Sequence, residues 1–145
     1  MPLPVEIAER LDALTSATRR DDALTLIETL RRVTGLEPHL WKGIISFGEY
    51  HYRYESGHSG TAPAAGFAPR ASATVIYLAD GIGTYAAELA LLGPHKTGVG
   101  CLYIARLDRV DVAVLESILA RSFAAVTAGT FLQRARDGEP AKATD

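Results

Sequence analysis

Residues 43–54 read GIISFGEYHYRY, and this stretch decides the fold class because its apolar residues change from the helical period to a period of two. We interpret Gly43–Phe47 as a strand, Gly48-Glu49 as a tight turn and Tyr50–Tyr54 as the returning strand. A strand that returns directly, without an intervening helix, pairs in the antiparallel sense. The centre of the chain is therefore predicted to be an antiparallel hairpin.

Helices are expected on both sides of this hairpin, at residues 4–15, from Asp21 or Asp22 to Val33 with a stop at Gly35, from Thr84 to Leu92, and from Asp108 or Asp111 to Val126. Further strands are expected at Ala73–Ala79 and Val99–Ala105, a long loop at 55–70, and a frayed tail from about residue 134. The order α-α-β-β-β-α-β-α predicts one α+β domain over residues 1–145, with an antiparallel sheet of four or five strands packed with helices.

Composition excludes several classes of protein. A chain of 145 residues that is 48% hydrophobic and 22% charged has the values of one globular domain. The net charge of −2 argues against a dedicated nucleic-acid binder, and the single cysteine excludes a disulfide framework and a thiolate zinc site. The sequence contains neither a signal-peptide pattern nor an apolar stretch of about 20 residues. We therefore expect a cytoplasmic protein that does not bind membranes.

Alternation divides the expected strands into two faces. Ile76 and Leu78 oppose Tyr77, and the residues of the last strand divide in the same way around Tyr103. One face is aliphatic and suits helix packing, whereas the other carries tyrosines, Cys101 and small residues. Tyrosine has an apolar ring and a polar hydroxyl, so such a face suits a half-wet pocket or an interface. We expect Cys101 to be a buried, inert thiol.

Two glycine-bearing loops place possible anion-binding groups beside this face. His58 lies within Ser56–Gly60, Arg70 follows Pro69, and His95-Lys96 lies within Gly93–Gly98. No metal ligand spacing and no cofactor motif occurs. The candidate ligand-binding residues are therefore Trp41, Tyr50, Tyr52, His58, Arg70, Tyr77, His95, Lys96 and Tyr103.

Four segments also carry a family likeness: residues 34–41, 45–57, 67–70 and 92–104. In order, they resemble the family catalogued as domain of unknown function 1801, also called YdhG-like. The resemblance implies a small bacterial α+β domain, loosely frataxin-like in shape, some of whose relatives are linked to intracellular iron delivery. The family pattern has a basic residue where this chain has His58, Ala71 and Val99, whereas Arg70, His95 and Lys96 match it.

Three functions remain open from the sequence. The first is binding of a small, anionic ligand over the tyrosine face, with His58 or His95 able to transfer protons near neutral pH and no reaction assigned. The second is a frataxin-like iron carrier, which would use the acidic residues Glu6, Glu9, Asp12, Asp21, Asp22 and Glu28. The third is a non-catalytic homodimeric interaction module that buries the tyrosine face against a second copy.

Overall fold

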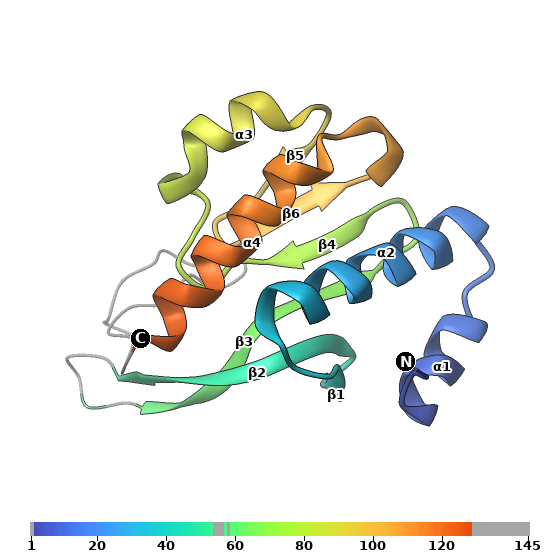
Figure 1. Cartoon of the computed structure of the whole chain (residues 1–145), viewed down its shortest axis with the longest axis horizontal. Helices are drawn as coiled ribbons and strands as arrows, with labels where there is room; N and C mark the ends of the chain where they lie inside the picture. The colour runs from blue at the N-terminus through green and yellow to red at the C-terminus, as the bar shows by residue number, and fades with distance from the viewer. Residues whose placement is uncertain (1, 54–56, 58, 129–145) are drawn as a thin grey trace.

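A six-stranded antiparallel sheet forms the frame of the protein (Figure 1). The computed structural model describes residues 2–53, 57 and 59–128. The strands are β1 (His39–Trp41), β2 (Ile44–Arg53), β3 (Ser59–Pro69), β4 (Thr74–Tyr77), β5 (Lys96–Thr97) and β6 (Cys101–Ile104), in the spatial order β1-β2-β3-β4-β6-β5. The predicted α+β class and antiparallel sheet are confirmed. The sheet has six strands rather than four or five, because β1 and β5 are too short for alternation to reveal and β3 was expected as a loop.

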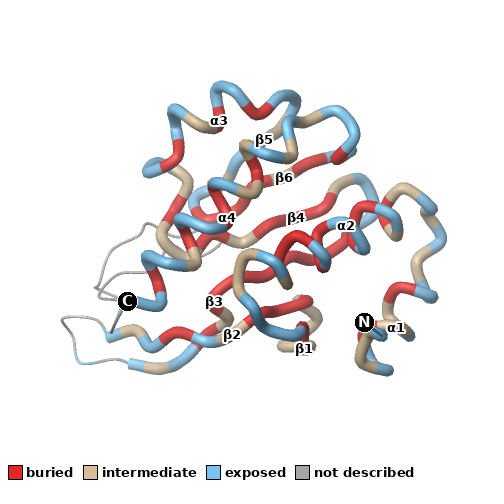
Figure 2. The backbone as a smooth tube through the Cα atoms, in the orientation of Figure 1, coloured by how far each residue is buried: buried red, intermediate tan, exposed pale blue. Residues whose placement is uncertain are grey.

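The helices are α1 (Val5–Asp12), α2 (Ala17–Thr34), α3 (Ala86–Leu92) and α4 (Val112–Thr127), with single 3-10 turns η1 (Gly83–Tyr85) and η2 (Leu107–Arg109). Every helix contributes to one apolar core that also contains strand residues such as Phe47, Phe67 and Leu102. In Figure 1, α2 and α4 cross this side of the sheet, and Figure 2 shows buried positions along β3, β4 and β6 beneath them. Helices α2 and α4 therefore cover one face, with α3 packed against α4 and α1 against α2 and β1, and no described helix covers the other face.

Helix starts and stops follow local hydrogen-bonding chemistry. Ser16 caps α2, because its Oγ accepts the backbone N–H of Arg19 at 3.2 Å. The prediction of a start at Asp21 or Asp22 was wrong, and Asp22 instead lies within the helix with a buried side chain. Gly35 ends α2 with φ of 72°, as predicted, and Asp111 caps α4 by accepting the backbone N–H of Ala113 at 3.0 Å.

The tight turn expected at Gly48-Glu49 was wrong, because β2 runs without a break from Ile44 to Arg53. The two-residue hairpin turn is instead Lys42-Gly43, with φ values of 50° and 81°. Gly48 has φ of 70°, and the inward side of the strand changes there. Phe47 points into the main core, and Tyr50, three residues on, is also buried against helix α4.

The long loop expected at 55–70 was also wrong, since most of it forms strand β3. Its glycine, alanine and proline residues have low strand propensity, yet Ala65 and Phe67 pair with β2 and are buried. Pro63 is tolerated because β4 pairs only with Gly66–Pro69, so this half of β3 has a single partner. The expected tail from about residue 134 lies outside the described residues, as do Tyr54 and His58.

Candidate functional site

The helix-free face of the sheet is the candidate site. Cross-strand partners share a face, and one continuous row joins His39, Ser46, Gly66, Tyr77 and Cys101 across β1, β2, β3, β4 and β6. This row alternates with core residues such as Ile76 and Leu102, so it lies opposite the helices.

A second row of the same face places aromatic, apolar and basic side chains in line. Trp41 pairs with Ile44 at one side of the sheet, while Val75 pairs with Tyr103, which pairs in turn with Lys96 of the opposite edge strand. Trp41 and Tyr103 are half-buried, and Lys96 is exposed. The face therefore combines ring surfaces with positive charge.

Each aromatic residue of this face has a cation beside it. The Nζ of Lys42 lies 4.8 Å from the ring centroid of Trp41, a cation–π distance. The Nη2 of Arg70 donates to the hydroxyl of Tyr77 at 3.3 Å. Lys96 completes the set as the cross-strand neighbour of Tyr103. Three aromatic–cation pairs thus line one side of the sheet.

Two of these pairs form a compact group, which we call the cation–aromatic cluster: Arg70, Tyr77, Lys96 and Tyr103. Tyr77 pairs with Cys101, two residues before Tyr103, so the two tyrosines are diagonal neighbours at roughly 7–8 Å. Arg70 and Lys96 are exposed on either side of them. This geometry suits an anionic group held by the cations and a flat ring laid on the tyrosines.

The cations of this face lack acidic partners among the residues that the structure describes. On the helix side, by contrast, five arginines form ion pairs with carboxylates: Arg19, Arg31, Arg32, Arg106 and Arg121. No carboxylate of the described chain lies within ion-pair distance of Lys42, Arg70 or Lys96. Their charge is therefore available to an external anion.

Tyr50 and Tyr52 do not join the cluster. Tyr50 is 3% exposed and packs with Ala62, Ala64 and Val126, on the side covered by α4. Tyr52 packs against the same group, with its ring centroid 6.1 Å from that of Tyr50. The reversal at Gly48 moves both tyrosines to the helix side, and so the predicted tyrosine face is divided between two sides of the sheet.

The histidines take different positions. His95 lies just before β5, and its Nδ1 is 2.7 Å from the carbonyl oxygen of Gly93. Lys96 points with Tyr103, so the preceding His95 belongs to the other side of the strand. His58 lies outside the described residues. Cys101 is 1% exposed within the open face, as expected of an inert thiol.

Lys42 was missed by sequence reasoning. Its role depends on the turn Lys42-Gly43, which folds the lysine back over Trp41. A Gly immediately after an exposed residue between two apolar runs is a hairpin signal, and it is present at residues 41–45. The expected turn at Gly48-Glu49 disregards this signal.

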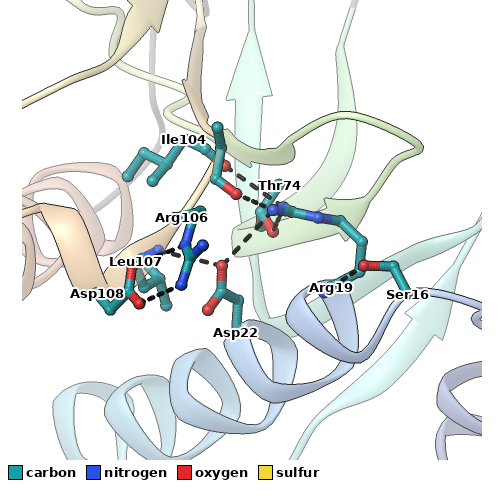
Figure 3. A network of polar contacts seen from close by, with 9 residues as sticks. Ser16, Arg19, Asp22, Thr74, Ile104, Arg106, Leu107 and Asp108 are labelled. Carbon is teal, nitrogen blue, oxygen red and sulfur yellow. Dashed lines mark hydrogen bonds and ion pairs between the residues drawn. The ribbon is translucent and has the colours of Figure 1, made fainter.

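A buried polar network joins α2 to the end of the sheet next to the cluster (Figure 3). Arg19 is 5% exposed, and its guanidinium donates to Thr74 Oγ1 at 2.8 Å and to the carbonyl of Ala105. Its Nη2 lies 3.8 Å from Asp22 Oδ2, which accepts the backbone N–H of Leu107 at 3.1 Å. Thr74 begins β4, directly after the turn that carries Arg70, so this network ties the start of β4 to α2.

A cavity of about 350 Å³ lies beside this network and away from the aromatic face. It is lined by Thr18, Asp21, Asp22, Thr25, Arg106, Leu107, Asp108 and Val112. Arg106 holds Asp108 through two hydrogen bonds of 3.0 and 2.6 Å, and it lowers the pKa of that carboxyl. The lining thus contains three carboxylates and one guanidinium, and Asp22 is paired with Arg19 outside the lining.

A second polar group lies under α4. Asp80 accepts the hydroxyl of Tyr85 at 2.5 Å and that of Ser122 at 2.6 Å. Burial, and then the hydrogen bond to Asp80, raises the pKa of Tyr85 above its usual range. Both hydroxyl-bearing residues are almost fully buried, so this group ties the loop after β4 to α4 rather than facing a ligand.

Within the described part of the chain, no group of three or more His, Cys, Asp or Glu side chains is arranged to hold a metal ion. The acidic residues considered for iron lie along α1 and α2, and Asp22 is engaged by Arg19 and Leu107. No described helix is both long and apolar enough to cross a bilayer.

Comparison with models of known protein families, with curated proteins and with solved structures finds no match to this chain. The function is therefore argued from the site itself.

Proposed function

We propose that the protein binds a small anionic ligand with a flat ring on the helix-free face of its sheet, at the cation–aromatic cluster. The observation that carries the proposal is the pairing of two half-buried tyrosines with two exposed cations that have no carboxylate partner in the described chain. Arg70 offers a planar fork of donors for a phosphate or carboxylate, and Lys96 adds a point charge. The rings of Tyr77 and Tyr103 offer a surface for stacking.

The YdhG-like assignment and a cytoplasmic location belong to the same proposal. The four segments that carry the family likeness contain Trp41, Arg70, Lys96 and Tyr103, which all belong to the helix-free face. A reducing compartment would keep the lone Cys101 as a thiol. No catalytic group is part of the proposal.

Deoxyadenosine 5′-monophosphate is a suitable probe, because it joins a phosphate to a flat base. Titration of isotope-labelled protein, followed by NMR, should shift the backbone amides around Tyr77 and Tyr103. Deoxyadenosine and inorganic phosphate, which each supply one half of the probe, should bind more weakly than the whole.

The double variant Arg70→Ala/Lys96→Ala should weaken binding of the monophosphate at least tenfold, since charge-assisted hydrogen bonds contribute about 1.5–3 kcal/mol each. The double variant Arg32→Ala/Arg109→Ala is the matched control, because it removes two exposed positive charges from the helix side. Equal affinity of the two double variants would refute the proposed site.

A second copy of the chain is the rival occupant of this face, favoured by one observation. Ser46 and Cys101 are 0% and 1% exposed although no described helix covers them, so this part of the face is dry. Light scattering at several protein concentrations separates the two. If the protein is a dimer and the Tyr103→Glu variant is a monomer, the interaction module is favoured. If the protein is a monomer that binds the monophosphate, the ligand site is favoured.

A further inference from the structure

The third aromatic–cation pair extends the same face well beyond the cation–aromatic cluster. Trp41 and Lys42 belong to the β1 side of the sheet, and Tyr103 to β6. Four strand steps separate β1 from β6, which at about 4.8 Å per step is roughly 19 Å. This distance is too long for one small ring-bearing anion to touch both ends.

Between the two ends, the described strands place apolar side chains and no carboxylate in the row of Trp41 and Tyr103. Ile44 lies next to Trp41, with its Cγ2 over Gly66, and Val75 lies next to Tyr103. Both belong to the face that carries the aromatic residues. The face therefore carries one aromatic–cation pair at the β1 edge and apolar side chains in the middle. The two tyrosines and two cations of the cation–aromatic cluster lie toward the other edge.

The charge of the face differs from that of the whole chain. The whole chain has a net charge of −2, whereas its six strands carry a single carboxylate, Glu49. Glu49 pairs with Pro63 in the middle of β2, at a different register position from the row that carries Trp41 and Tyr103. Arg53 is exposed farther along the same hairpin. A polyanion would therefore meet this face with little repulsion.

We propose that the occupant of the whole face is a single-stranded nucleic acid laid across the strands. Such a strand repeats the two groups that the face can take, an anionic phosphate and a flat base, at successive points. Aromatic side chains stack on any base, and a basic surface follows the backbone, which is the usual basis of sequence-tolerant single-strand binding. In a duplex the bases already stack on one another, so duplex DNA would offer only its phosphates.

This inference rests on the proposed function, because it extends the same site from one nucleotide to several. An acidic peptide would satisfy the cations but leave the three rings without flat partners. It is therefore the alternative that the test has to exclude.

The test uses fluorescein-labelled oligodeoxyadenylate of about eight nucleotides, within the roughly 4–16-nucleotide range of single-strand sites. Fluorescence anisotropy should show binding at least tenfold tighter than that of deoxyadenosine monophosphate. Three cations, at about −0.7 per phosphate for single strands, predict a slope near −2 for log K against log salt. Trp41 is the chain's single tryptophan, so quenching of its emission reports the base contact directly.

Variants separate the two ends of the face. Trp41→Ala should weaken the oligonucleotide about tenfold and leave the monophosphate unchanged, whereas Arg70→Ala/Lys96→Ala should weaken both. Trp41→Leu keeps an apolar side chain at β1, so it separates loss of stacking from loss of folding. Arg32→Ala/Arg109→Ala again serves as the control.

The inference is overturned if the oligonucleotide binds no tighter than the monophosphate, if duplex DNA of the same length binds as well, or if a polyglutamate peptide competes equally. Binding of the monophosphate alone would leave the proposed function standing. Absence of binding by both probes would remove the two together.

Discussion

Replacement of Arg19 by methionine should remove the polar contacts between α2 and the sheet and so lower the stability of the protein. Arg19 is 5% exposed, and its guanidinium makes contacts with Thr74, Ala105 and Asp22 that methionine cannot make. Methionine keeps most of the side-chain volume, so the effect reports polar contacts rather than a cavity.

The expected loss is about 3–4 kcal/mol. Removal of one member of a buried ion pair costs about 3–5 kcal/mol, because the remaining charge stays buried without its partner. Asp22 is 8% exposed but keeps the backbone N–H of Leu107 as a donor at 3.1 Å, which moderates the penalty. Domains of this size have a total stability of about 5–15 kcal/mol, so the variant should remain folded in water.

Urea denaturation followed by circular dichroism measures this loss. The midpoint should fall by more than about 1 M urea, since slopes for small proteins are roughly 1–3 kcal/mol per molar. The double variant Arg19→Met/Asp22→Asn should be no less stable than the single one, because the carboxylate charge is then gone. A loss below about 1 kcal/mol, or equal to that of the exposed Arg109→Met, would show that the network does not stabilise the fold.

Three further predictions follow from local geometry. Gly48→Ala should cost about 1–2 kcal/mol, because a Cβ at φ of 70° is strained and would meet Leu36 Cδ1 at 3.0 Å; a thermal shift below that of a surface Gly→Ala change would contradict this. Burial and the hydrogen bond to Asp80 raise the pKa of Tyr85 above its usual value of 10.0, so the unfolded chain loses the phenolic proton at a lower pH than the folded one. The contribution of Tyr85 to stability should therefore be fully present below pH 10 and should fall as the pH rises above 10. Tyr85→Phe should lose stability at neutral pH and flatten this decline in urea titrations at several pH values, and an unchanged slope would argue against the Tyr85 contribution. Cys101 should react with a thiol reagent only as fast as the protein opens, and rapid labelling of the native protein would contradict its 1% exposure.

Some features of the fold were predictable because they depend on neighbours in the chain. Gly35 ends α2 and Asp111 caps α4 as expected, since a left-handed stop and a side-chain cap involve only a few adjacent residues. Alternation also divided β4 correctly, with Ile76 in the core and Tyr77 on the other face. These assignments needed no knowledge of distant contacts.

Strand β3 could not be predicted from its own residues. Its Gly, Ala and Pro content is typical of a loop, and it becomes a strand because β2 and β4 supply its hydrogen-bond partners. Small residues are suited to this place, since a Cβ at Gly66 would come within 2.9 Å of Ile44 Cγ2. Long-range pairing here overrides local propensity.

The sequence by itself determined the α+β class, the helices, and the concentration of aromatic and basic residues in the middle of the chain. The tertiary structure decided which of those residues act together. Gly48 reverses the sides of β2, so Tyr50 is covered by α4 while Tyr77 stays on the open face. Whether a cation is paired also depends on contacts between distant segments, which explains why an acidic chain presents a basic sheet face. A period of two gives the faces of a strand only while the backbone keeps its extended conformation, and one left-handed residue is enough to exchange them.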